Sequence, residues 1–157
     1  MMNTTASTAQ RPVLLIEDNQ LEYHAIARGL AKLNVPNPVV HFRNGDEALE
    51  YVRSYRPSTG EPDQTPALVI LDLNLPDTHG REILTVLKQH ETLRVIPVIV
   101  WSISADPQDI KLCYLDGANS YIQKTVSIGG TEELLKNITS YWLDLVSLPA
   151  PEPSRNA

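Results

Sequence analysis

The sequence predicts an α/β protein whose core is a doubly wound parallel sheet of five strands that alternate with helices. Two observations lead to this fold class. Short runs such as Val13–Ile16 and Leu68–Leu71 are continuously apolar, which is typical of parallel strands covered by helices on both faces. Between the runs, apolar residues recur at three- and four-residue spacing, the period of an amphipathic helix. The predicted strands are residues 13–16, 39–42, 67–73, 96–101 and 120–122.

The first two helices are marked by apolar periodicity and by the residues at their ends. The first spans residues 21–33, and the prolines that follow prevent it from continuing. The second begins at Asn44, which resembles a capping box together with Glu47 three residues later. The loop of residues 56–66 holds three prolines and a glycine, and it separates this helix from the third strand.

The other three helices follow the same alternation. Apolar clusters at residues 83–87 and 110–114 mark the third and fourth helices. Gly117 follows the fourth helix and suits a left-handed cap. The fifth helix is predicted over residues 134–148, after which a Pro-rich segment begins.

Bulk properties narrow the classes of function. A chain of 157 residues fits one domain that can bury a proper core, so no second domain is expected. The net charge of -6 disfavours partners that need a basic face, so neither nucleic acid nor an anionic membrane is expected. No apolar run reaches the ~20 residues that span a bilayer. The single Cys113 fits a reducing cytoplasm.

Polar residues stand just past four of the predicted strands. Because the carboxyl ends of parallel strands share one edge of the sheet, these side chains are expected to meet in one pocket. Each residue alone has an ordinary interpretation, such as a helix cap, a turn residue, a loop hydroxyl or a solvated charge. Their joint placement is what favours a functional site. The residues are Glu17, Asp18, Asp72, Ser102 and Lys124.

Carboxylates, a hydroxyl and an ammonium suit a divalent cation and a phosphoryl group. A carboxylate can act as a nucleophile toward phosphorus, and Asp72 is the predicted acceptor. Lys124 would neutralise one phosphoryl oxygen, and Ser102 would donate a hydrogen bond to another. Mg²⁺ prefers oxygen ligands and would offset the repulsion between carboxylates and an anionic donor. The candidate Mg²⁺ ligands are Asp18, Asp72, Glu17 and the backbone carbonyl of Asn74.

These motifs resemble the receiver domains of two-component response regulators over residues 12 to about 140. The resemblance rests on Glu17-Asp18, on the block 71–76 with the later Gly80, on Ser102, and on Tyr121 with Lys124. It implies a flavodoxin-like (βα)5 fold with strand order 2-1-3-4-5. It also implies a switch in which Ser102 moves toward the phosphoryl group and Tyr121 turns inward.

Two residues depart from the commonest receiver pattern. Glu17 replaces the more usual Asp, so its carboxylate reaches further. Lys124 is followed by Thr125, where many receivers have proline. A cis bond before a residue other than proline costs ~3 kcal/mol, so the usual cis bond is not expected here.

The carboxyl end resembles the single-domain regulators that are paired with phytochrome-type histidine kinases. Residues 141–148 extend beyond the usual receiver end and are apolar all round, which favours an interface. The resemblance implies a cytoplasmic light-signalling protein, a sensor histidine kinase as partner, and a homodimer. The alternative is that this segment folds back onto its own core. The predicted dimer residues are Tyr141, Trp142, Leu145 and Leu148.

The predicted organisation has three parts. Residues 1–10 are expected to be disordered, residues 11–148 to form the receiver domain, and residues 149–157 to form a flexible Pro-rich tail.

An aspartyl-phosphate phosphohydrolase usually needs a second Asp at the position of Asn74, so a phosphoacceptor is predicted rather than a turnover enzyme. A scaffold that signals without phosphate stays open. A DNA-binding regulator is disfavoured because the chain is acidic and no helix-turn-helix is expected.

Overall fold

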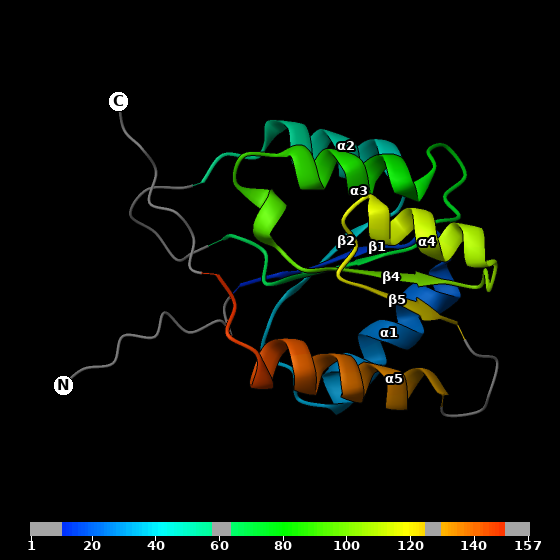
Figure 1. Cartoon of the computed structure of the whole chain (residues 1–157). Coiled ribbons are helices and arrows are strands. Elements are labelled where there is room, and N and C mark those ends of the chain that lie inside the picture. Colours follow the sequence, from blue (N-terminus) through cyan, green and yellow to red (C-terminus); the bar gives the residue numbers. More distant parts are fainter. Residues whose placement is uncertain (1–10, 58–63, 125–129, 150–157) are drawn as a thin grey trace.

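The computed structural model describes residues 11–57, 64–124 and 130–149. Five parallel strands form one sheet in the order β2-β1-β3-β4-β5, which confirms the predicted fold (Figure 1). The strands are β1 (Val13–Ile16), β2 (Val39–Phe42), β3 (Leu68–Leu71), β4 (Val98–Ser102) and β5 (Ser120–Gln123). The helices are α1 (Gln20–Lys32), α2 (Gly45–Ser54), α3 (Gly80–Gln89), α4 (Pro107–Leu115) and α5 (Gly130–Thr139), with a 3-10 turn η2 (Leu93–Val95) and a π-helical turn η3 (Ser140–Leu145).

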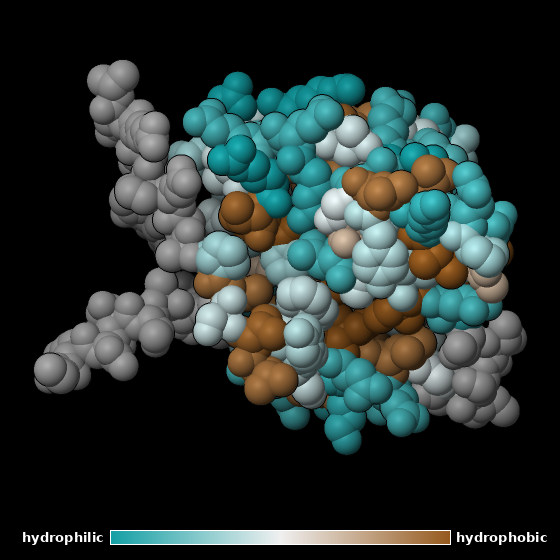
Figure 2. All heavy atoms as spheres, in the orientation of Figure 1, coloured by the Kyte–Doolittle hydropathy of each residue, from teal (hydrophilic) through white to brown (hydrophobic). Residues whose placement is uncertain are grey.

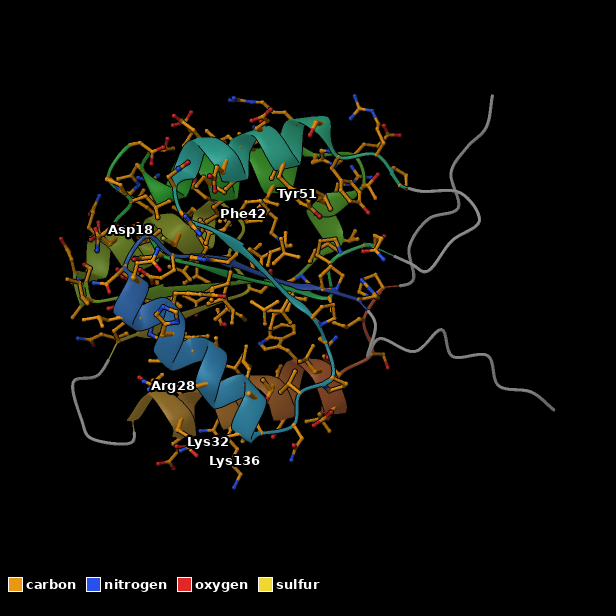
Figure 3. All side chains as sticks on the ribbon, turned by 180° about the vertical axis from the view of Figure 1, so that it is seen from behind. Asp18, Arg28, Lys32, Phe42, Tyr51 and Lys136 are labelled. Atoms are coloured by element: carbon orange, nitrogen blue, oxygen red, sulfur yellow. The ribbon has the colours of Figure 1, made fainter. Side chains whose placement is uncertain are left out.

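Helices cover both faces of the sheet, and alternate strand residues build two separate cores. Helices α2, α3 and α4 cover one face, while α1 and α5 cover the other (Figures 1 and 3). Leu14 and Ile16 of β1 belong to the core under α2 and α3, whereas Val13 and Leu15 belong to the core shared with α1 and α5. Burial on both faces explains why the strand sequences are continuously apolar.

Polar residues at the helix ends behave as their positions predict. The Asn44 side chain accepts a hydrogen bond from the backbone N–H of Glu47, 2.9 Å away, and begins α2. The Glu47 carboxylate returns a contact to the N–H of Arg43, one residue before the cap. Gly117 follows α4 with φ +105°, the left-handed conformation that favours glycine.

The last helix differs from the prediction of one helix over residues 134–148. α5 begins earlier, at Gly130, and ends at Thr139, and η3 ends at Leu145. The N–H of Val146 donates to the carbonyl of Tyr141, 3.0 Å away, which is the i→i+5 bond of a π-turn. The chain is extended from Val146, and the carbonyl of Pro149 accepts a hydrogen bond from the Arg11 side chain at 3.1 Å. The helix therefore ends earlier than predicted, and the chain beyond it contacts Arg11.

Three predictions concern residues outside the described ranges: the disordered residues 1–10, the tail from residue 150 onward, and the bond between Lys124 and Thr125. Within the described residues, none of the helices combines the length and apolar character needed to cross a membrane.

Candidate functional site

Strand register brings the first two acidic residues together at the carboxyl edge of the sheet. Ile16 and Leu71 are paired in the β1–β3 ladder, so Glu17 and Asp72 follow directly from neighbouring positions. The backbone N–H of Asp72 donates to the carbonyl of Ile16 at 3.0 Å, which extends the ladder by one residue. Both side chains are almost fully buried, with 3% of Glu17 and 6% of Asp72 exposed.

Lys124 lies at the centre of the acidic group. Its backbone N–H donates to the carbonyl of Ser102 at 2.7 Å, which places the lysine directly after β5 and beside the end of β4. Its ammonium lies 3.2 Å from a carboxylate oxygen of Asp72 and 3.2 Å from one of Glu17. A third, very short bond joins it to Glu22.

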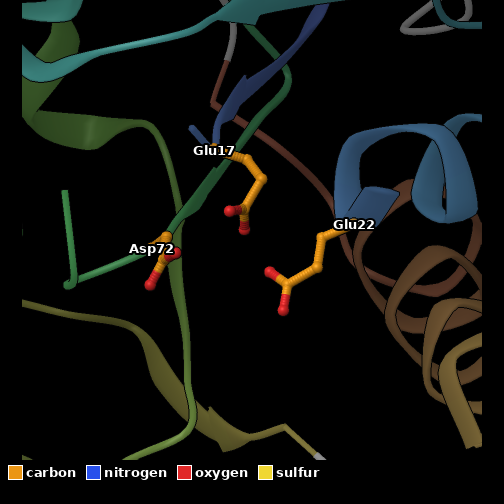
Figure 4. A group of neighbouring side chains, drawn as sticks. All are labelled: Glu17, Glu22 and Asp72. Atoms are coloured by element: carbon orange, nitrogen blue, oxygen red, sulfur yellow. The ribbon is translucent and has the colours of Figure 1, made fainter. Parts of the chain in front are cut away.

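Three carboxylates converge on this point. Oxygen atoms of Glu17, Glu22 and Asp72 lie within 4.8 Å of one another, and Figure 4 shows the side chains directed into a common space. Hard divalent cations bind such oxygen atoms, so the residues present fit the predicted metal. Glu22 was not predicted as part of the site. The available signal was its place in the first turn of the helix that follows the acidic pair, where an acid usually serves only the helix dipole.

Burial and mutual repulsion set the protonation of the group. Burial, followed by the negative charge of Asp72, raises the pKa of Glu17 to about 8. Burial opposes the charge on Lys124, but the hydrogen bond to Glu22 and the charges of Asp72 and Glu17 outweigh it and raise the pKa of the ammonium. Burial also opposes the charge on Glu22, yet its bond to Lys124 lowers the pKa of this carboxyl group. Three acidic side chains therefore share one ammonium in this pocket.

The other two predicted metal ligands, Asp18 and Asn74, are not among the three converging acids. Asp18 is half-buried where the chain leaves β1 (Figure 3), and it is not one of the three acids that converge. Asn74 is exposed, and its backbone N–H donates to Oδ1 of Asp72 at 3.1 Å. That bond orients the Asp72 carboxylate from the side opposite Lys124.

Backbone contacts hold the acidic turns in place. The carbonyl of Glu17 accepts a hydrogen bond from Nε2 of His41 at 2.7 Å, and the His41 ring stacks on Tyr23 of α1 at 3.8 Å. A Cβ atom added at Gly80 would come within 2.5 Å of the Asp72 carbonyl, so glycine is needed for this close approach. His41 was not singled out by its sequence position.

The two predicted switch residues lie on adjacent strands, two register positions apart: Tyr121 of β5 pairs with Val100 of β4, and Ser102 pairs with Gln123. Ser102 is fully buried, and its hydroxyl accepts a hydrogen bond from the N–H of Ser104 at 3.2 Å. Tyr121 is half-buried, and its hydroxyl donates to the carbonyl of Ser104 at 2.7 Å. Both side chains thus contact the same loop between β4 and α4.

The predicted dimer residues fall into two groups. Tyr141 and Leu145 are exposed, at 49% and 74%. Trp142 packs against the core between the sheet and α1 and α5, as the alternative interpretation of this segment expected. Leu148 is half-buried. Figure 2 shows hydrophobic residues on the face that carries α4, β5 and α5. Tyr114 and Leu115 of α4 and Ile103, just after β4, are exposed.

Comparison with known proteins supports the resemblance to receiver domains that the sequence motifs indicate. The family described as response regulator receiver domain matches residues 13–139. The chain belongs to this family. The matched region includes all the polar residues predicted at four strand ends, which are Glu17, Asp18, Asp72, Ser102 and Lys124.

Individual relatives agree with this assignment. Response regulator Rcp1 of a Synechocystis species is 30% identical over 144 residues, which cover 92% of this chain and 97% of the relative. The probable methanogenesis regulatory protein FilR2 of Methanothrix harundinacea is 34% identical over 139 residues, 88% of each protein. The crystal structure of the phosphorylated cyanobacterial phytochrome response regulator RcpA is similar with a TM-score of 0.79 at 36% identity, covering 90% of this chain and 99% of that one. Rcp1 has also been solved in a Mn²⁺-bound form, with a TM-score of 0.78.

Proposed function

We propose that this protein is a single-domain response regulator that accepts a phosphoryl group on Asp72 from a phosphohistidine kinase. The observation that carries the proposal is the environment of the Asp72 carboxylate. It is buried at the carboxyl edge of the sheet, one oxygen lies 3.2 Å from the Lys124 ammonium, and the other accepts from the Asn74 N–H. The nucleophile and a cation that can neutralise a phosphoryl oxygen are therefore already adjacent.

The proposed transfer exchanges one bond to phosphorus for another. One Asp72 oxygen forms a bond to phosphorus while the P–N bond of the phosphohistidine breaks, and the imidazole nitrogen leaves with the electron pair. Lys124 compensates the charge on the transferred group, and the Ser102 hydroxyl donates to one of its oxygens. Positioning and charge stabilisation account for the rate, as expected for phosphoryl transfer.

A Mg²⁺ ion would be held by Asp72, Asp18, Glu17 and the carbonyl of Asn74. When bound, it would neutralise the carboxylates and one phosphoryl oxygen. The three acidic side chains that surround one ammonium support this requirement. Divalent cations bound to relatives, such as Mn²⁺ in Rcp1, support it as well.

The output would be a change of surface on the face of α4, β5 and α5. Ser102 and Tyr121 both hydrogen-bond to Ser104, so a movement of Ser102 toward the phosphoryl group would disturb the Tyr121 contact. Tyr141 and Leu145, which are exposed on η3 directly after α5, would contribute to a homodimer. Trp142 and Leu148 would act from their more buried positions.

The kinase is proposed to be of the phytochrome type and the protein to act in the cytoplasm. The similarity to Rcp1 and RcpA, which covers about nine tenths of the chain, supports a phytochrome-type partner. FilR2, a relative of similar identity, has a different regulatory description. The kinase is therefore best identified by comparing phosphotransfer rates from purified candidate kinases.

The deciding experiment is incubation with acetyl phosphate and Mg²⁺, followed by intact-mass measurement. We expect one added phosphoryl group, about 80 Da, that is absent in the Asp72→Asn variant and in EDTA. Light scattering on the same samples measures whether the protein is a dimer and whether phosphorylation changes that. An adduct that persists in Asp72→Asn would place the acceptor elsewhere. No adduct from acetyl phosphate or from any kinase would favour the scaffold, and a monomer at all concentrations would exclude the dimer.

A further inference from the structure

The Glu22 side chain reaches the proposed phosphoryl pocket from α1 rather than from a strand end. The Asn19 side chain accepts from the N–H groups of Leu21 and Glu22, so the first turn of the helix is fixed beside the acidic turn after β1. The carboxylate then points toward Glu17 and Asp72 (Figure 4). It is the most accessible acid of the three, with 37% of its side chain exposed.

The bonds of Lys124 show what Glu22 does there. A lysine ammonium has three N–H donors, and in this structure it contacts three carboxylates: Glu17, Glu22 and Asp72. The contact to Glu22 is the shortest of the three. All the donor capacity of the ammonium is thus in use before any phosphoryl group arrives.

A phosphoryl group on Asp72 needs one of these donors. Glu17 and Asp72 are held inside the pocket, because less than a tenth of either side chain is exposed. Glu22 alone can exchange its bond to Lys124 for water by turning outward. Its charge also opposes the entry of an anionic phosphoryl donor, since like charges repel in a partly buried site.

We propose that Glu22 is an internal competitor of the phosphoryl group for Lys124 and so limits phosphorylation of Asp72. This inference rests on the proposed function. In the unphosphorylated protein Glu22 holds the ammonium, and in the phosphorylated protein a phosphoryl oxygen takes its place. The residue therefore disfavours spontaneous phosphorylation by small-molecule donors and raises the dependence on a kinase.

The test compares wild type with Glu22→Gln, which keeps the size of the side chain and removes its charge. We expect about three- to tenfold faster phosphorylation by acetyl phosphate, and beryllofluoride affinity higher by a similar factor, because a charge-assisted bond is lost only from the unphosphorylated state. The readout of beryllofluoride binding would be the fluorescence of Trp101, which lines a cavity of about 80 Å³ together with Glu22 and Lys124. Each variant is assayed at a Mg²⁺ concentration that saturates it, so that a change in metal affinity does not enter the comparison.

Two control variants distinguish the effect of the contact between Glu22 and Lys124 from the effect of removing a negative charge elsewhere. Glu133→Gln removes one charge from an exposed position on α5. It should change neither the phosphorylation rate nor the beryllofluoride affinity by more than about twofold. Glu22→Asp keeps the charge but shortens the side chain, so it should lie between wild type and Glu22→Gln. Slower phosphorylation or unchanged beryllofluoride affinity in Glu22→Gln would overturn the competitor role while leaving Asp72 as acceptor. Failure of wild type to bind beryllofluoride would instead count against the proposed function.

Discussion

One nearly buried cation stands at each end of the sheet, and the groups around the two cations differ. At the amino end, Arg11 is 3% exposed and donates to the backbone carbonyls of Thr65, Pro66 and Pro149. At the carboxyl end, Lys124 contacts three carboxylates. Carbonyls are neutral dipoles with fixed positions, whereas carboxylates carry charge that one lysine does not neutralise.

The difference separates a structural role from a functional one. Arg11 joins three segments of backbone, including the extended chain after η3, and these bonds need not change during function. Lys124 is one positive charge among three acidic side chains. A divalent cation could add positive charge to this pocket, and a phosphoryl group could replace a carboxylate at Lys124. Substitution of the two cations should therefore affect different properties of the protein.

The largest effect is expected for Lys124→Met. The variant should be phosphorylated by acetyl phosphate on the order of 10²- to 10³-fold more slowly, because the cation that neutralises a phosphoryl oxygen is missing. The measurement is the time course of the mass adduct at saturating Mg²⁺. Lys136→Met, an exposed position on α5, serves as the control (Figure 3). A rate within a factor of three of wild type would remove Lys124 from the reaction.

Arg11→Met should show the opposite behaviour. We expect a loss of about 2–4 kcal/mol in the free energy of unfolding, because buried carbonyl groups lose a charged donor. The phosphorylation rate of the folded variant should stay within about twofold of wild type. Urea unfolding measures the first quantity, with the exposed Arg28→Met as control, expected within about 0.5 kcal/mol of wild type. A large loss of phosphorylation rate in a folded Arg11→Met protein would contradict the separation of the two ends.

The sequence predicted which residues lie at the carboxyl edge of the sheet better than it predicted how those residues contact one another. Strand runs end where the apolar residues end, so Glu17, Asp72, Ser102 and Lys124 could be placed at one edge from periodicity alone. Glu22 could not, because its role depends on how α1 approaches the strand ends, and this angle is set by core packing. The π-turn was not predicted either, and the chain beyond it contacts Arg11, a residue distant in the sequence. The apolar pattern of residues 141–148 carries no sign of that contact.

The smallest predicted effect concerns the pH dependence of stability at the carboxyl end. The pKa of Glu17 is about 8 in the folded protein, against an ordinary value of 4.5. The folded state therefore binds this proton more tightly than the unfolded state, and metal-free stability should fall as the pH rises from 4.5 to 8. The slope from this group reaches at most about 1.4 kcal/mol per pH unit.

Glu17→Gln should remove this dependence, because the variant has no proton to lose at that position. Urea unfolding of wild type and variant in EDTA at pH 5.5, 6.5 and 7.5 measures the difference between their free energies of unfolding. The variant should become more stable relative to wild type as the pH rises. Parallel profiles for wild type and Glu17→Gln would show that the crowding of carboxylates around Lys124 does not strain the folded state. The contrast between the two ends would then rest on phosphorylation alone.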